Sequence, residues 1–406
     1  MLCQLFSVFI VIFLTITQAL GSPITQKKQT HEPKIICLIE DQQGNVILEK
    51  DSKKRFNPAS TLKLLTSLVA LRCLGEDYRF KTEFYLSSQN DLKIKGYGDP
   101  VLISEIWNRL AKKISEKVKA INNILIDDSF FSTAVKIPGV GNSLNPYDAP
   151  VGALCVNFNT IYVKKTKDNR FISAEPQTPL IQFALRQIKK MHIKETGRYV
   201  ISHKTTVAEM YAGELFKYFL KECGVSVKGK VGFGAVNPED KLIYVYYSDY
   251  PLKEVIRKMM KYSNNFIANQ ITLILGAEFY GPPATLEKGI SVIKEYAKRK
   301  LGLKGISIVE GSGISRHNFI SCQDMIIILK KFAPYMKLLK RKANLYYKTG
   351  TLKGIATRAG YIIKGKKIYS FVLFLRGDPQ TADQILLHLS HMSHSASFNP
   401  EDLMVR

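Results

Sequence analysis

The segment 60–74 constrains the fold most, because it is a fifteen-residue apolar run without Pro or Gly. Lys63 is the only charged residue between positions 62 and 71. Residues three apart share a helix face, so Ser60 and Lys63 are expected to point the same way. Desolvation on a buried helix lowers the pKa of a lysine toward the range of a general base. Because a serine hydroxyl needs such a base to become a strong nucleophile, the pair predicts covalent catalysis.

Two further motifs follow in order, Ser263-x-Asn265 and Lys348-Thr349-Gly350. Each motif alone is a weak signal, but the ordered set is specific. Ser263 can act beside Lys63 as a hydroxyl relay that carries a proton to a leaving amine. Asn265 can hydrogen-bond a substrate amide through both ends of its side chain. Lys348 adds positive potential that keeps Lys63 neutral and attracts an anionic substrate.

The third motif also offers groups for binding an extended peptide. The hydroxyls of Thr349 and Thr351 can hydrogen-bond a terminal carboxylate. Gly350 leaves the strand edge open, so that a peptide can pair along it. The oxyanion of an acyl-transfer reaction is expected at two backbone N–H groups, those of Ser60 and Thr351.

The amino-terminal segment is typical of a secretory signal peptide. Residues 2–14 are almost entirely apolar, and Ala19-Leu20-Gly21-Ser22 forms a small-x-small site. We expect residues 1–21 to be removed, with an uncleaved anchor as the alternative. No later segment reaches eighteen consecutive apolar residues, so the remaining chain is predicted to be exported to the periplasm or cell envelope.

The net charge of +25 admits two interpretations. It favours peripheral association with an anionic membrane or cell-wall polymer, or it reflects lysines spread over solvated faces, which we prefer. Nucleic acid is not expected as a partner, because the chain has an export signal and no recognisable binding module. Five cysteines remain after Cys3, widely spaced and without a C-x-x-C pair. We therefore predict no metal and no cofactor.

Periodicity and turn signals predict a mixed α/β chain. Strands are predicted at 34–40, 45–49, 80–86, 92–96, 123–126, 158–164, 198–203, 225–232, 343–347, 359–363 and 368–375. Helices are predicted at 60–74, 104–118, 208–223, 252–275, 284–301 and 322–332. Strands at both ends and long helices after residue 252 predict one catalytic domain built from residues 22–76 and 241–406. Residues 77–240 are predicted to form an inserted mixed α/β domain.

At this point the chain resembles a known family. Residues 56–63, 96–100, 263–268, 311–316 and 348–353 are similar to segments of the D-alanyl-D-alanine carboxypeptidase/endopeptidase family of class C low-molecular-mass penicillin-binding proteins. The resemblance implies a β-lactamase/transpeptidase-like domain, an antiparallel sheet flanked by helices, with an insert. It also implies a serine carboxypeptidase that cleaves peptidoglycan stem peptides, and endopeptidase action on cross-links. β-Lactams are expected to acylate Ser60.

The resemblance also implies two further substrate contacts. An acidic residue of the insert, placed after an apolar strand, meets the amino group of the substrate's diamino acid; Asp127 matches it best, with Asp128 adjacent. A strand-end turn is the alternative role for Asp127. Arg316 is expected either to bind a substrate carboxylate or to brace its loop.

Two other functions compete with the peptidase. One is a β-lactamase or esterase on the same scaffold. The large insert, and the lack of a clear E-x-x-L-N deacylation motif, argue against it. The other is a catalytically silent cell-wall-binding protein, which the intact set of motifs argues against.

Overall fold

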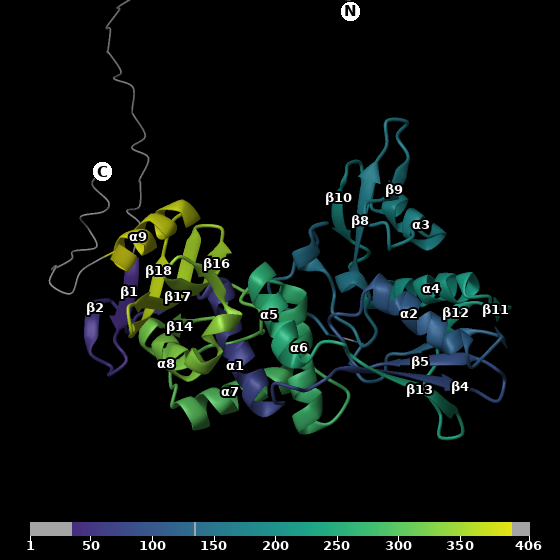
Figure 1. The fold of residues 1–406 in the computed structure, drawn as a ribbon, viewed down its shortest axis with the longest axis horizontal. Helices are drawn as coiled ribbons and strands as arrows, with labels where there is room; N and C mark the ends of the chain where they lie inside the picture. Colours follow the sequence, from purple (N-terminus) through teal and green to yellow (C-terminus); the bar gives the residue numbers. More distant parts are fainter. Residues whose placement is uncertain (1–34, 134, 392–406) are drawn as a thin grey trace, which may run out of the picture. The chain divides into compact units, whose positions relative to one another are not determined.

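The computed structural model describes residues 35–133 and 135–391. Figure 1 traces the chain from its first strand, β1, to its last described helix, α9. The predicted signal peptide, residues 1–21, lies outside the described ranges. Within those ranges, no helix is both long and apolar enough to cross a membrane.

The first sheet contains strands from both ends of the chain. Its order is β15-β16-β17-β18-β1-β2, and all its neighbouring strands are antiparallel. The strands are β1 (Ile35–Glu40), β2 (Val46–Lys50), β15 (Lys340–Lys342), β16 (Leu345–Leu352), β17 (Ile355–Lys364) and β18 (Lys367–Leu375). Ile35 of β1 lies opposite Leu375 of β18, so the first and last predicted strands are neighbours. The antiparallel sheet predicted from the sequence is confirmed.

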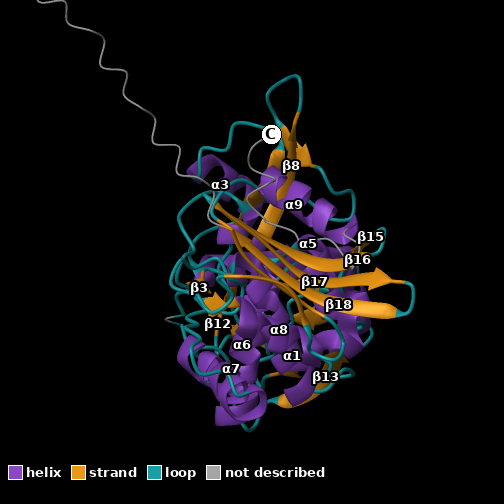
Figure 2. Ribbon diagram, turned by 90° about the vertical axis from the view of Figure 1, so that its left-hand side faces the viewer, coloured by secondary structure: helices purple, strands orange, loops and turns teal. Residues whose placement is uncertain are grey.

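Helices cover both faces of this sheet, because successive side chains of a strand point to opposite faces. Val372 and Phe374 of β18 belong to the core that contains α1 and α8, whereas Phe371 and Leu373 belong to the core that contains α9. Figure 2 shows α9 on one side of β16, β17 and β18, and α1 and α8 on the other. These helices are α1 (Lys63–Cys73), α8 (Cys322–Phe332) and α9 (Pro379–His391).

The helical segment predicted at 252–275 is two helices, so that prediction was wrong. The helices are α5 (Leu252–Tyr262) and α6 (Asn265–Tyr280), followed by α7 (Leu286–Leu301). Ser263 ends α5 in the left-handed region, with φ +53. Asn264 then caps α6, because its side-chain oxygen accepts a hydrogen bond from the N–H of Ile267 (2.9 Å). This break sets the position of the second motif.

The second sheet is mixed, with order β12-β7-β5-β4-β13. Its strands are β4 (Lys81–Leu86), β5 (Leu92–Gly96), β7 (Ile124–Asp127), β12 (Val231–Phe233) and β13 (Lys241–Tyr247). Helices α2 (Ser104–Ser115) and α4 (Thr205–Glu222) share its apolar core, in which the ring of Phe216 lies 4.7 Å from Trp107 and 5.4 Å from Phe84. The unpredicted β13 pairs with β4, so this sheet continues beyond residue 240.

The remaining strands are short. A third sheet has the order β10 (Gly197–Val200), β8 (Thr160–Lys165), β9 (Phe171–Ser173), and α3 (Gln182–Lys190) lies between β9 and β10 in sequence. Two-stranded pairs join β6 (Ala120–Ile121) to β11 (Ser226–Val227) and β3 (Arg55–Phe56) to β14 (Ile320–Ser321). The prediction of a single strand at 225–232 was wrong, because this segment contains two short strands, β11 and β12. The side chain of Asn123 fills the space beside Gly229, which separates β11 from β12.

Separate buried clusters accompany the two larger sheets. The first contains side chains of α1, α6 and α8, and the second contains side chains of α2 and α4. The division into a catalytic domain at 22–76 and 241–406 and an insert at 77–240 stays a prediction. The pairing of β13 with β4 shows that residues 241–247 belong to the second sheet.

Candidate active site

Ser60 lies in a tight 3-10 turn, Ala59–Leu62, that leads directly into α1. Ala59 has a left-handed backbone, with φ +46, which is uncommon for a residue other than glycine. Its N–H donates to the side-chain oxygen of Asn57 at 2.9 Å. The turn sets Ser60 Oγ 3.0 Å from Nζ of Lys63, the first residue of α1. The two side chains expected to act together are therefore in hydrogen-bond contact.

The amine of Lys63 is fully buried and lies within hydrogen-bond distance of three oxygens. Besides Ser60 Oγ, these are Asn265 Oδ1 and the backbone carbonyl of Ser312, each at 2.7 Å. Burial lowers the pKa of Lys63 well below its ordinary value, and the charge of Lys348 lowers it further, against an opposing effect of a carboxylate, Glu310. A neutral amine can donate to Asn265 and Ser312 while its lone pair accepts the proton of Ser60.

Lys348 is the second buried lysine of the site. Its Nζ lies 2.7 Å from Ser263 Oγ and 2.6 Å from the backbone carbonyl of Thr349. Burial lowers the pKa of Lys348 to about 7, and the positive charge of Arg358 adds to this effect. Ser263 is expected from the sequence beside Lys63, but its hydrogen bond is to Lys348. The difference follows from the left-handed turn at Ser263, at a position predicted to lie inside a helix.

Asn265 is the first residue of α6 and contacts Lys63 directly. Its amide oxygen accepts from Nζ of Lys63, so that end of the side chain is already engaged. The expectation that both ends of the amide bind substrate is therefore corrected: the NH2 end is the one left for a substrate carbonyl.

Gly350 allows β16 to approach the turn that carries Ser60. A Cβ at this position would lie 2.8 Å from the backbone nitrogen of Ser60 and 2.2 Å from Thr357 Oγ1, so a side chain does not fit. The Thr357 hydroxyl donates to the carbonyl of Pro58 at 2.7 Å and ties the turn to β17. Residues 348–352 pair with β17 on one edge, and no strand of the described chain pairs with their other edge. That edge is open to a peptide.

A cavity of about 570 Å³ lies beside Ser60. Its lining contains Ser60, Ser263 and Asn265 of the first two motifs, and Thr351, which directly follows the third motif. Tyr147 and Tyr262 also line it, and no motif or spacing in the sequence points to either. Both rings are largely exposed, at 52% and 70%, so they offer an apolar surface with a polar tip beside the nucleophile.

Glu310 is a further residue of the site that the motifs did not identify. Its carboxylate is fully buried and accepts hydrogen bonds from five donors. The donors are the N–H and hydroxyl of Ser312, the N–H groups of Gly313 and Ser315, and the amide of Asn318. These bonds fold the loop whose Ser312 carbonyl contacts Lys63. The sequence signal that could have identified Glu310 is its position as an isolated acidic residue directly before Gly-Ser-Gly.

Arg316 lies outside the cavity beside Ser60. Its guanidinium donates to the backbone carbonyl of Lys353 at 2.7 Å, which braces the loop against the end of β16. The residue also lines a neighbouring cavity of about 510 Å³ that shares Tyr147 and Leu352 with the first. Carboxylate binding by Arg316 stays a prediction, because the observed bond is internal.

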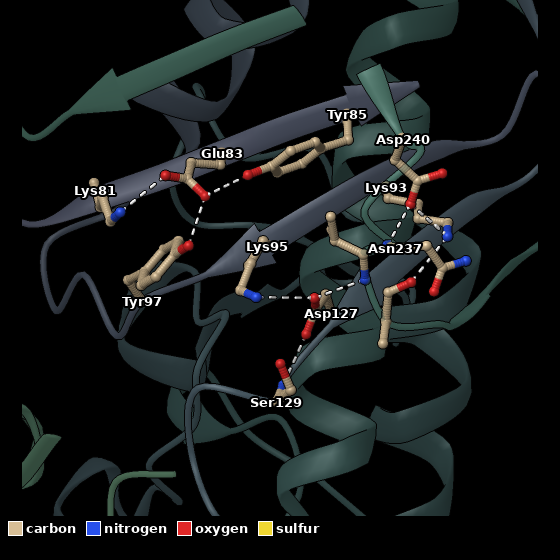
Figure 3. A network of polar contacts seen from close by, with 12 residues as sticks. Lys81, Glu83, Tyr85, Lys93, Lys95, Tyr97, Asp127, Ser129, Asn237 and Asp240 are labelled. Carbon is tan, nitrogen blue, oxygen red and sulfur yellow. Dashed lines mark hydrogen bonds and ion pairs between the residues drawn. The ribbon is translucent and has the colours of Figure 1, made fainter. Parts of the chain in front are cut away.

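Asp127 lies at the end of β7, where its carboxylate is buried in a polar network. Figure 3 shows this carboxylate between Lys95 and Ser129. It accepts from the N–H groups of Ser129 (2.9 Å) and Val236 (2.8 Å), and Lys95 Nζ lies at 3.4 Å. Burial acts to raise the pKa of Asp127, but these bonds and Lys95 outweigh it and the pKa is lowered. The contacts match the strand-end role, and substrate binding by Asp127 stays a prediction.

Comparison with known proteins places this geometry in a family. A model described as the D-Ala-D-Ala carboxypeptidase 3 (S13) family matches residues 23–198 and 192–341. The chain belongs to this family. The predicted resemblance and the predicted class of enzyme, a serine-type D-Ala-D-Ala carboxypeptidase, are thereby confirmed at the level of the family.

Relatives and solved structures similar to this S13 chain extend along most of its length. The D-alanyl-D-alanine carboxypeptidase DacB of Haemophilus influenzae is 23% identical and covers 82% of this chain and 83% of its own length. The crystal structure of penicillin binding protein 4 (dacB) from the same organism aligns with a TM-score of 0.70 and 19% identity, covering 92% and 94% of the two chains. The Bd0816 predatory endopeptidase of Bdellovibrio bacteriovorus aligns at 0.56 and 18%, covering 88% and 93%. These alignments confirm the predicted fold class.

Proposed function

We propose that the chain is a serine D-alanyl-D-alanine carboxypeptidase that cleaves peptidoglycan stem peptides through an acyl-enzyme on Ser60. One observation carries the proposal: the fully buried Lys63 has its Nζ 3.0 Å from Ser60 Oγ. Membership of the S13 family supports the reaction class.

Acylation begins when neutral Lys63 accepts the proton of Ser60. The oxygen of Ser60 attacks the carbonyl carbon between two D-alanines and forms a tetrahedral oxyanion. Two backbone N–H groups, those of Ser60 and Thr351, stabilise this charge. Gly350 supports this arrangement, because its lack of a side chain lets β16 lie against the Ser60 turn.

The leaving amine needs a proton before the peptide C–N bond breaks. The hydrogen-bonded pair of Lys348 and Ser263 can supply one through the serine hydroxyl, while Lys63 holds the proton taken from Ser60. The proton on Lys63 then replaces the one that Lys348 gave up, so both lysines return to their starting states. The hydroxyls of Thr349 and Thr351 bind the terminal carboxylate of the substrate.

Deacylation repeats the same chemistry with water as the nucleophile. Lys63 accepts a proton from water and the hydroxide attacks the ester carbonyl. The ester C–O bond then breaks, and Ser60 takes the proton back from Lys63 and leaves as the hydroxyl. A β-lactam presents a strained amide to the same serine, so it acylates Ser60 in place of the peptide. The structure of the Haemophilus influenzae penicillin binding protein 4 complexed with a β-lactam supports this step. No metal or organic cofactor has a part in the proposal.

Endopeptidase action on cross-links belongs to the same proposal, and the aligned predatory endopeptidase supports it. The alternatives are a β-lactamase or esterase on this scaffold and a non-catalytic cell-wall-binding protein. We also propose export to the periplasm or cell envelope after removal of residues 1–21, with peptidoglycan and β-lactams as partners. Peripheral association with the membrane or cell wall would use the net charge of +25.

A fluorescent penicillin tests the proposal against its alternatives. Stable labelling that is lost in Ser60→Ala supports the peptidase, rapid turnover of the label indicates a β-lactamase, and no labelling indicates a binding protein. Release of D-alanine from a pentapeptide then separates a peptidase from an esterase. Labelling without any release of D-alanine contradicts the proposed substrate.

A further inference from the structure

Among the described residues, Arg358 is the one arginine whose side chain is buried, at 2% exposure. It lies on β17, opposite Thr349 of β16. Its carboxylate partner is Asp383 of α9, whose Oδ1 lies 2.7 Å from Nε of Arg358 and whose side chain is 53% exposed. Burying a guanidinium costs free energy, and a half-exposed partner offsets only part of that cost. Apart from its effect on the pKa of Lys348, the steps above give Arg358 no function.

The guanidinium of Arg358 contacts backbone carbonyls from three elements. Nη1 lies 2.8 Å from the carbonyl oxygen of Thr357 and 3.5 Å from that of Gly350, and Nη2 lies 3.0 Å from that of Pro379. These carbonyls belong to β17, β16 and α9 respectively. Because α9 lies on one side of these strands (Figure 2), the arginine connects that helix to the part of the sheet beside the active site.

The carbonyl of Gly350 belongs to the peptide unit that carries the N–H of Thr351. The two groups are opposite ends of one planar trans peptide, so they point in opposite directions. Arg358 therefore contacts the back of the peptide whose N–H is proposed to bind the oxyanion. A positive charge at a peptide carbonyl polarises the peptide and makes its N–H a stronger hydrogen-bond donor.

The carbonyl of Thr357 belongs to the residue that holds the Ser60 turn. The Thr357 hydroxyl donates to the carbonyl of Pro58 at 2.7 Å, and it lies so close to Gly350 that a Cβ there would be 2.2 Å away. β16, β17 and the Ser60 turn thus meet at Thr357. By contacting both carbonyls, Arg358 holds the two backbone segments that supply the proposed oxyanion donors.

We propose that Arg358 is a positioning residue for the oxyanion site formed by Ser60 and Thr351. The inference rests on the proposed acyl-transfer function and assigns a further residue to it. The buried guanidinium does not touch the substrate. It acts through the Gly350–Thr351 peptide, which it fixes and polarises, and α9 holds the guanidinium through Asp383. Arginine stays protonated, so it adds no proton transfer to the reaction.

The charge of Arg358 gives a readout that a purely structural role would not affect. The titratable groups that face it are Asp383 on α9 and, on β16, Tyr347 and Lys348. Lys348 in turn faces Lys63 of α1. In the proposed reaction Lys348 gives a proton through Ser263, so acylation slows as the pH rises and Lys348 deprotonates. Because the charge of Arg358 lowers the pKa of Lys348, removing it should move this alkaline limb to higher pH.

The rate of penicillin acylation, measured from pH 5 to pH 10, tests the inference. Arg358→Gln keeps an NH2 group but removes the charge, and it should slow acylation about tenfold and move the alkaline limb to higher pH. Arg358→Lys keeps the charge, so the limb should stay in place, but one ammonium cannot reach all the acceptors and acylation should stay slow. Arg299→Gln, which removes an arginine paired with Glu295 on exposed α7, should change neither.

Asp383→Asn gives a test in the opposite direction, which decides the question even where Arg358→Gln does not fold. It removes the carboxylate that partly neutralises the guanidinium, so the alkaline limb should move to lower pH. An unchanged acylation rate in Arg358→Gln overturns the inference. So does a limb that fails to rise in Arg358→Gln, or one that rises in Asp383→Asn. Absence of penicillin labelling in the unaltered protein instead refutes the proposed function, and the inference with it.

Discussion

Lys348→Met should make the protein more stable and much less active near neutral pH. Burial lowers the pKa of Lys348 from 10.5 to about 7. At about 1.4 kcal/mol for each pKa unit, burying the charged form costs roughly 5 kcal/mol. Methionine has a similar length and no charge, but it loses the hydrogen bonds to Ser263 and Thr349, worth about 1 kcal/mol each. The expected net gain is about 3 kcal/mol in free energy of unfolding below pH 7.

The gain in free energy of unfolding from Lys348→Met should decrease as the pH rises. Below pH 7 both the folded and the unfolded chain carry the lysine charge, so the folded state bears the full cost of burial. Between pH 7 and 10.5 only the unfolded chain stays protonated, and the destabilisation by Lys348 fades. The advantage of Lys348→Met therefore shrinks with rising pH and reverses near about pH 9, and above about pH 10 little but the loss of the two hydrogen bonds remains.

Urea unfolding followed by circular dichroism from pH 6 to pH 10 measures this difference. Fluorescence of Trp107, the only tryptophan, follows unfolding of the second core in the same samples. Lys298→Met serves as the exposed control. Penicillin acylation should slow by about a hundredfold, because the Ser263 relay loses its partner. A variant that is less stable than the unaltered protein at pH 6 would refute the buried-charge argument for Lys348.

Two other substitutions test the loop that supports Lys63. Glu310→Gln should cost roughly 3–5 kcal/mol in urea unfolding, because buried donors lose a charged acceptor. It should also move the acid limb of the acylation rate to lower pH, since the carboxylate raises the pKa of Lys63; a move to higher pH contradicts this reasoning. Gly313→Ala should abolish penicillin labelling, because its Cβ would lie 1.9 Å from the carbonyl oxygen of Ala59. Gly302→Ala is the matched control: it has the same left-handed backbone in open space and should cost about 1 kcal/mol with labelling intact.

The sequence predicted which chemical groups would meet better than it predicted their exact pairing. Acyl transfer requires a nucleophile, a base and a second cation, so the three motifs were expected to converge. Lys63 does contact both Ser60 and Asn265, the second of them some 200 residues away. The partner of Ser263 could not be predicted, because its left-handed turn has no glycine or proline to mark it. Tertiary packing of α5 and α6 decides that conformation.

Other features of the fold and the site were not predicted from the sequence for similar physical reasons. The strand β13 has a run of β-branched and aromatic residues that was available as a signal, and its pairing with β4 depends on contacts more than 150 residues away in sequence. The function of Glu310 depends on donors that converge on it only after the loop has folded. The cavity beside Ser60 is lined by residues from distant segments, including Tyr147 and Tyr262, so no local pattern predicts it.

Peptide mapping of the penicillin adduct by mass spectrometry shows whether Ser60 is the nucleophile that Lys63 activates. The protein is incubated with penicillin, digested, and compared with Ser60→Ala treated in the same way. We expect a single covalent adduct on the peptide that contains Ser60, and none in the variant. An adduct on any other residue, or one that persists in Ser60→Ala, would contradict the role of Ser60.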